Sequence, residues 1–142
     1  MATKADFTEA EWQTLEKGVT GAGMMVSLAD PHLFDSFKEV GALAGYLNEA
    51  RQKSSSTLIR DLATARTTGF GFGSSPQAVE TEALEALRGA MALLQAKAPD
   101  ESWAYSELVL GLSQSVANAV SGVVPAESAA IDKIRAALQT AQ

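Results

Sequence analysis

Three carboxylates near one predicted turn are the residues of this chain best suited to bind a hard cation. Asp35 and Glu39 are four residues apart and would share one face of a helix, and Asp30 lies about one turn before them. Calcium and magnesium prefer oxygen ligands of this kind. The pattern indicates one weak divalent-cation site, for calcium or a similar ion. In the alternative interpretation Asp30 caps a helix and the other two carboxylates are solvated.

A short basic segment is a second candidate site, suited to an anionic partner or a lipid head group. Its members are Arg51, Lys53, Arg60 and Arg66. The alternative is that these side chains form the solvated end of a helical hairpin. No aromatic residues alternate with them, as the stacking of nucleic-acid bases would require. Because the formal net charge of the chain is −6, we expect no nucleic-acid partner.

No catalytic constellation is visible, so we expect a protein without enzymatic activity. His32 is the one histidine and the chain has no cysteine, which leaves no Cys-His pair and no evident Ser-His-Asp arrangement. The glycine-rich residues 69–75 lack the Lys-Ser/Thr pair of a phosphate-binding loop. Their two phenylalanines, Phe70 and Phe72, either anchor this loop to the core or contact a protein partner.

The elements that position these residues are predicted to be helices. Apolar residues recur at helical spacing, and no run of alternating β-branched residues indicates a strand. Breaks at residues 30–31, 54–56, 67–74, 98–100 and 121–125 divide the chain into about six helices. The expected fold is therefore all-α: a compact single-domain bundle over residues 1–142, arranged as helical hairpins. The Gly/Phe-rich loop at residues 69–75 would separate its two halves.

The first predicted helix has a clear start. Thr8 and Glu11 have the spacing of a capping box, and Phe7 and Trp12 have the spacing of a hydrophobic staple. Glycines inside the same helix, including Gly18, weaken it and predict that a neighbouring helix approaches closely.

Two further expectations concern packing. Gly41 and Gly45 of the second helix are four residues apart and predict a close helix crossing there. The fifth helix is expected to be central and buried, since it is apolar around most of its circumference.

Two segments of the chain resemble the tellurite-resistance TerB-like family. Residues 110–127 are similar to the terminal hairpin of that family, in which a small-residue helix is followed by a Val-Ser-Pro-x-Glu helix start. Residues 26–31 are similar to its first acidic turn. The resemblance implies an all-helical cytoplasmic domain that serves as an accessory or scaffold protein in a stress-related process.

The same resemblance implies metal ligands, because the acidic turns bind divalent metal in some members of the family. Asp30 matches the aspartate of the first turn, and Glu127 matches the glutamate of the second. Pro31 stands where the family has glycine, and Ser121 stands where the second turn has aspartate. The second turn therefore has one carboxylate fewer than the family's pattern.

Two other functions remain open. One is a helical module that binds a protein partner, or a second copy of itself, through its small-residue helices and the loop with Phe70 and Phe72. The other is a binder of an apolar small molecule, in a pocket between Met24, Met25, Met91 and the two tryptophans. The charged first residues do not resemble a secretory signal, and no stretch has the length and apolar character of a membrane span. We therefore expect a cytoplasmic location.

Overall fold

The regular structure of this protein is helical throughout the part that the computed structural model describes, namely residues 4–29, 36–54, 57–63, 76–117 and 125–139. The helices are α1 (Glu9–Ala29), α2 (Ser36–Lys53), α3 (Thr57–Ala63), α4 (Pro76–Lys97), α5 (Ser102–Ala117) and α6 (Pro125–Gln139). Short 3-10 turns, η1 (Lys4–Asp6) and η2 (Pro99–Glu101), precede α1 and α5. The prediction of an all-α bundle of about six helices is confirmed. The loop at residues 69–75 and the predicted helix start at residues 30–31 lie outside the described residues.

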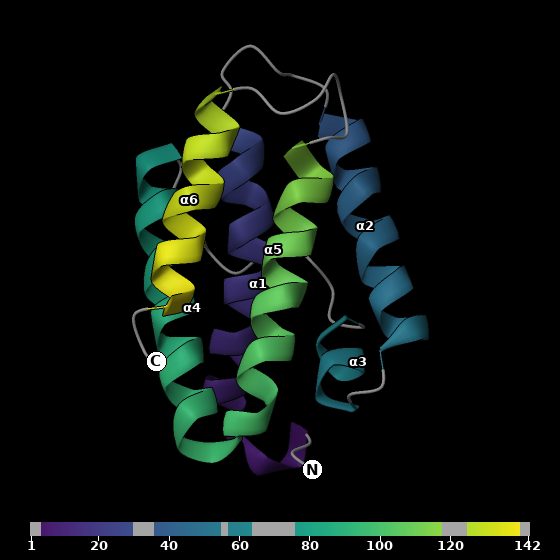
Figure 1. Cartoon of the computed structure of the whole chain (residues 1–142), viewed down its shortest axis with the longest axis vertical. Helices are drawn as coiled ribbons and strands as arrows, with labels where there is room; N and C mark the ends of the chain where they lie inside the picture. Colours follow the sequence, from purple (N-terminus) through teal and green to yellow (C-terminus); the bar gives the residue numbers. More distant parts are fainter. Residues whose placement is uncertain (1–3, 30–35, 55–56, 64–75, 118–124, 140–142) are drawn as a thin grey trace.

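Helix α1 is the centre of the bundle. It packs most extensively on α4, and also on α5 and α6. Helix α2 packs mainly on α5, and α3 bridges α2 and α5. Figure 1 accordingly shows α5 between α6 on one side and the α2–α3 pair on the other. The α2–α3 pair is therefore attached to the bundle chiefly through α5.

The start of α1 forms as its local sequence predicts. The Thr8 backbone N–H donates to Glu11 Oε1 at 2.8 Å, and the Glu11 N–H donates to Thr8 Oγ1 at 3.1 Å. The rings of Phe7 and Trp12 lie 6.2 Å apart between centroids, which completes the hydrophobic staple. The capping carboxylate also forms an ion pair with Lys97 at 2.6 Å, so the beginning of α1 is tied to the end of α4.

The core consists largely of apolar residues at helical spacing on α1, α4 and α6. Their buried members include Leu15, Val19, Ala22, Val26, Ala83, Leu87, Met91, Leu94, Ile134 and Leu138. Tyr105 of α5 is fully buried among them, and its hydroxyl donates to the Leu15 carbonyl oxygen at 2.8 Å. A Cβ atom at Gly18 would collide with that hydroxyl. The predicted close approach to the glycines of α1 is thus confirmed at Gly18.

Helix α5 is buried on one side only, although its composition is apolar around most of its circumference. Tyr105, Leu108 and Leu112 are buried, whereas Trp103 exposes 70% of its surface. At about 100° per residue, Trp103 lies roughly 200° around the helix from Tyr105. The expectation of a helix buried around most of its circumference is therefore wrong for the side that carries Trp103.

The predicted crossing at Gly45 is also wrong. A Cβ atom there would meet nothing within 4 Å, and the surroundings of Gly41 lie outside the described residues. The close contact between α2 and α5 depends instead on Gly111 of α5, because the Tyr46 ring occupies the space that a Cβ at position 111 would need. The glycine that allows α2 and α5 to approach closely is therefore Gly111 on α5 and not Gly45 on α2.

Candidate interaction surface

The structure leaves the predicted cation site untested. Asp30 and Asp35 lie outside the described residues, and so do the side chains of Glu39 and Glu127, which belong to α2 and α6. Within the described ranges, no group of three or more His, Asp or Glu side chains is placed to hold a metal ion. The cation site remains a prediction from the sequence, as does a contact role for Phe70 and Phe72, which the structure does not describe either.

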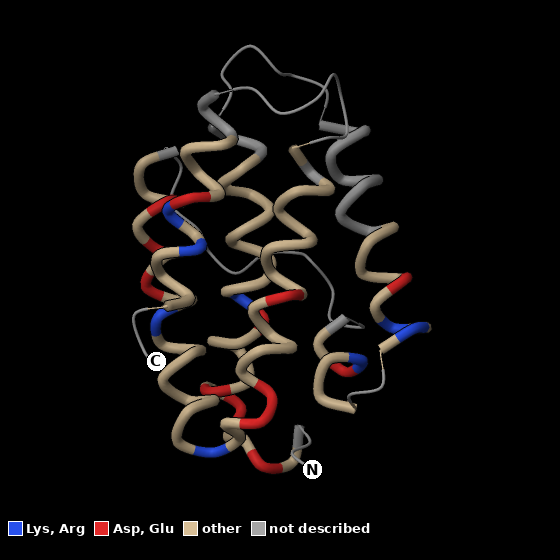
Figure 2. Tube along the Cα trace, viewed as in Figure 1, with Lys and Arg blue, Asp and Glu red and all other residues tan. Residues whose placement is uncertain are grey.

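Three of the four predicted basic residues lie on the α2–α3 pair, and all three are exposed. Arg51 and Lys53 are in the last turn of α2 and Arg60 is on α3, while Arg66 is not described. Figure 2 shows these basic positions on the part of the trace that α2 and α3 form. The only charged residue of the neighbouring helix α5 is an acidic one, Glu107.

The predicted pocket between methionines and both tryptophans is not formed. Trp12, Met25 and Met91 are core residues, whereas Trp103 lies on the surface. A shallow apolar depression exists between α1 and α4, lined by small residues such as Ala10, Gly89 and Ala92. It presents few polar groups that could orient a small molecule.

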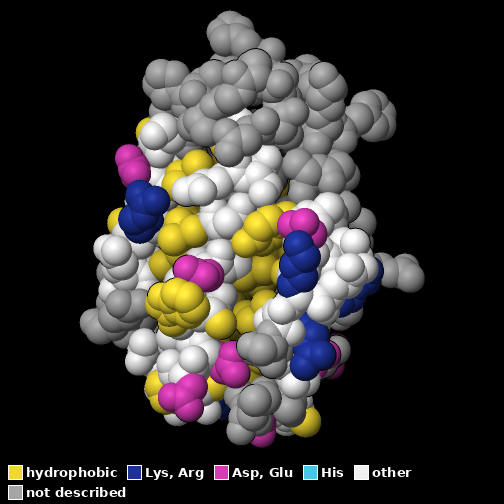
Figure 3. Space-filling view, turned by 45° about the vertical axis from the view of Figure 1, so that its right-hand side comes forward, with side chains coloured by type: hydrophobic (Ala, Val, Ile, Leu, Met, Phe, Trp, Pro, Cys, Tyr) yellow, Lys and Arg dark blue, Asp and Glu magenta, His cyan; other side chains and the backbone are white. Residues whose placement is uncertain are grey.

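Trp103 is the functional candidate that the sequence did not single out. It is the one large hydrophobic side chain that is mostly exposed among the residues the structure describes. Glu107 and Leu110 follow it at helical spacing on α5, and Tyr46 and Ala50 share the adjoining side of α2. We call these five residues the α2–α5 face. In Figure 3 hydrophobic side chains gather over α5 and the neighbouring side of α2, with an acidic side chain among them and side chains of both charge signs beside them.

The pKa of the Tyr46 phenol reflects the burial and the charges around this face. Burial raises the pKa of the Tyr46 phenol above its ordinary value, and the negative charges of Glu107 and Glu49 raise it further. Both carboxylates therefore lie near the ring. The phenol is therefore neutral at physiological pH, and Tyr46 adds aromatic surface but no charge to this face.

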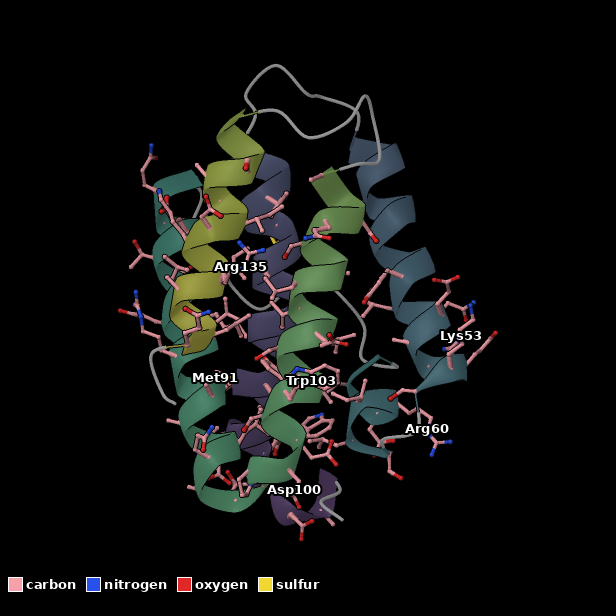
Figure 4. The ribbon with its side chains drawn as sticks, viewed as in Figure 1. Lys53, Arg60, Met91, Asp100, Trp103 and Arg135 are labelled. Atoms are coloured by element: carbon pink, nitrogen blue, oxygen red, sulfur yellow. The ribbon has the colours of Figure 1, made fainter. Side chains whose placement is uncertain are left out.

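Charged side chains lie within and beside the α2–α5 face. Glu107 is on α5, one turn after Trp103, whereas Lys53 and Arg60 lie on the α2–α3 side (Figure 4). Lys53 Nζ is 3.5 Å from the exposed Glu49 carboxylate. Glu107 and Arg60 form no ion pair with any other residue that the structure describes. Glu107 lies within the face, whereas the α2–α3 side carries charges of both signs, with Lys53 and Arg60 beside Glu49 and Asp61.

No family model, curated protein or solved structure matches this chain. None of the described helices combines the length and apolar character needed to cross a membrane. The described helices form an all-α bundle that exposes one large aromatic side chain, Trp103, on α5. The similarity to TerB-like proteins stays a prediction carried by the two turns.

Proposed function

We propose that this chain is a non-enzymatic helical domain that binds protein through its α2–α5 face. The observation that carries the proposal is the 70% exposure of Trp103 beside the partly exposed Tyr46 and Leu110. Tryptophan and tyrosine are the residues that most often dominate binding energy at protein interfaces, and contiguous apolar surface marks contact sites. The accessory or scaffold role, the TerB-like relationship and the cytoplasmic location predicted from the sequence belong to this proposal.

The proposal favours protein over a small molecule as the ligand because the face is open. A small ligand needs a concave site that covers most of its surface, whereas Trp103 projects from the outer side of α5 (Figure 4). An aromatic side chain on a helix surface is instead suited to insert between the side chains of a partner. The binding energy would then come from covering Trp103 and its apolar neighbours.

Site-specific photocrosslinking in cells tests the proposal. The photoreactive residue p-benzoylphenylalanine replaces Trp103 in one variant and Glu85, an exposed residue of α4, in the control. We expect a covalent protein adduct from position 103 and none from position 85. Failure of position 103 to form an adduct with any protein, or equal adducts from both positions, would refute a binding role for the α2–α5 face.

A further inference from the structure

Resting on that proposed function, we infer that the α2–α5 face binds a protein segment that presents an arginine side chain between apolar side chains. The guanidinium group of this arginine lies over the indole of Trp103 and forms an ion pair with the carboxylate of Glu107. The apolar neighbours of the arginine cover Leu110 and Tyr46.

Glu107 lies in the middle of the outer side of α5. Trp103, Glu107 and Leu110 follow one another at helical spacing, and Trp103 and Glu107 are both exposed. Glu107 is the only charged residue of α5, and it forms no ion pair with any residue in the described ranges. The outer side of this helix therefore combines apolar surface with one uncompensated negative charge.

The carboxylate of Glu107 also lies close to α2. Its negative charge contributes to the raised pKa of the Tyr46 phenol. The Tyr46 ring packs against Gly111, which follows Glu107 by one helical turn. A partner that covers the apolar surface of α5 and the adjoining side of α2 must therefore cover Glu107 as well.

This requirement selects the charge of the partner. Removing a carboxylate from water without a compensating cation is unfavourable, so a purely apolar segment would lose at Glu107 part of the binding energy that it gains at Trp103. An acidic segment would add like-charge repulsion. A basic side chain replaces the lost hydration with an ion pair, and the net charge of −6 attracts a basic segment over a longer distance.

The basic residues of the α2–α3 side do not reverse this preference. Lys53 Nζ is 3.5 Å from the Glu49 carboxylate, and Arg60 is followed by Asp61 on α3. The charges on that side therefore largely compensate one another, whereas Glu107 has no such counter-charge on its own helix.

The aromatic neighbour of Glu107 favours arginine over lysine. Side chains four residues apart on a helix are neighbours, so a group that stacks on Trp103 is within reach of Glu107. The planar guanidinium group stacks on aromatic faces and donates two parallel hydrogen bonds to a carboxylate. The ammonium group of lysine acts as a compact point charge and lacks this planar geometry.

Selection from a random peptide library displayed on phage tests the inference on the pure protein. Peptides that bind the parent protein but not Trp103→Ala report on this face. We expect arginine with apolar residues on both sides to be the most enriched feature of these peptides. Peptides selected on Glu107→Gln should lose the arginine. Glu85→Gln is the matched control, since it removes the same charge from an exposed position of α4, and it should select the same arginine-containing peptides as the parent.

Fluorescence anisotropy of one selected, labelled peptide then measures the contact. Replacement of the peptide's arginine by glutamine should raise the dissociation constant for the parent about tenfold or more, and for Glu107→Gln less than about twofold. Equal losses against both proteins, arginine-free peptides from the parent, or no peptide that distinguishes the parent from Trp103→Ala would each overturn the inference. A position 103 that crosslinks to protein in cells despite any of these results would leave the proposed function standing, so the two failures are distinguishable.

Discussion

Replacement of Gly18 by alanine should destabilise the protein, although alanine is the better helix former. On the backbone of α1, a Cβ at position 18 would collide with the Tyr105 hydroxyl and lie 3.2 Å from Leu87 Cδ2. The Tyr105 side chain cannot swing away, because it is fully buried and its hydroxyl is bound to the Leu15 carbonyl oxygen at 2.8 Å. The extra methyl must therefore push a rigid ring out of its position.

The expected change is the difference between two opposing effects. The gain in helix propensity from glycine to alanine is about 1 kcal/mol. Displacing the buried hydroxyl from its acceptor costs about 1–3 kcal/mol, and overpacking of the core costs about 1–3 kcal/mol. The net loss in free energy of unfolding is then about 1–5 kcal/mol.

The substitution Tyr105→Phe tests whether the Tyr105 hydroxyl causes the destabilisation by Gly18→Ala. The ring carbon that carries the hydroxyl, Tyr105 Cζ, is 3.6 Å from the added Cβ, which is an ordinary van der Waals distance. Only the 3.2 Å contact with Leu87 Cδ2 then stays tight, so Gly18→Ala in the Tyr105→Phe background should be close to neutral, because the gain in helix propensity of about 1 kcal/mol offsets a small shift of Leu87. The two substitutions should show a coupling free energy of roughly 2 kcal/mol.

Urea unfolding followed by far-ultraviolet circular dichroism measures all four proteins of this cycle. The slope of the unfolding free energy against urea should be the same for each, so that midpoints report stability. If Gly18→Ala unfolds at the same urea concentration as the parent or a higher one, the close contact between α1 and α5 is not as described. Additive effects of the two substitutions would exclude the hydroxyl as its cause.

Three other substitutions probe individual contacts of the fold. Gly45→Ala should stabilise α2 by about 0.5–1 kcal/mol, because the added methyl meets no atom within 4 Å; a lower urea midpoint would contradict the open position of Gly45. Gly111→Ala should push the partly exposed Tyr46 ring into solvent and lower the pKa of its phenol toward about 10. Tyrosinate absorbance would then show ionisation at a lower pH than in the parent, and an unchanged titration would refute the contact between Gly111 and Tyr46. Lys97→Met should raise the pKa of the Glu11 carboxyl, because the hydrogen bond from Lys97 is the largest cause of its lowered pKa. A lowered pKa of Glu11 contributes stability at neutral pH, and that contribution is lost as the pH falls through the pKa of the folded state. Lys97→Met should therefore also weaken the loss of stability in acid. Glu11 carboxyl chemical shifts that titrate as in the parent would contradict the ion pair.

The burial of Tyr105 predicts that the fold loses stability at alkaline pH. Complete burial raises the pKa of the Tyr105 phenol far above its ordinary value, so the neutral phenol stabilises the folded state below about pH 10. That contribution decreases above pH 10, because the unfolded chain then loses the proton that the folded chain keeps. Tyr105→Phe should remove this part of the pH dependence, and equal alkaline midpoints for parent and variant would contradict it.

Local features of this chain follow from its sequence because they depend on residues one helical turn apart. The capping box of Thr8 and Glu11 and the staple of Phe7 and Trp12 are formed as predicted. The buried stripes of α1, α4 and α6 were predictable for the same reason, since spacing along a helix determines which side chains share a face. The basic residues of α2 and α3 were also found from the sequence, but the residues of α5 that lie near them were not.

The rotation of each helix was decided by the tertiary structure. Helix α5 is apolar on several sides, so its sequence does not say which side faces the core. The choice is made by contacts such as the hydrogen bond from Tyr105 to Leu15, 90 residues away in the chain, and it leaves Trp103 in solvent. In the same way, the space for the α2–α5 crossing comes from Gly111 and not from Gly45. Only packing of separate helices places Glu107 of α5 near Tyr46 of α2, because no spacing within one helix can specify the neighbour that lies against it.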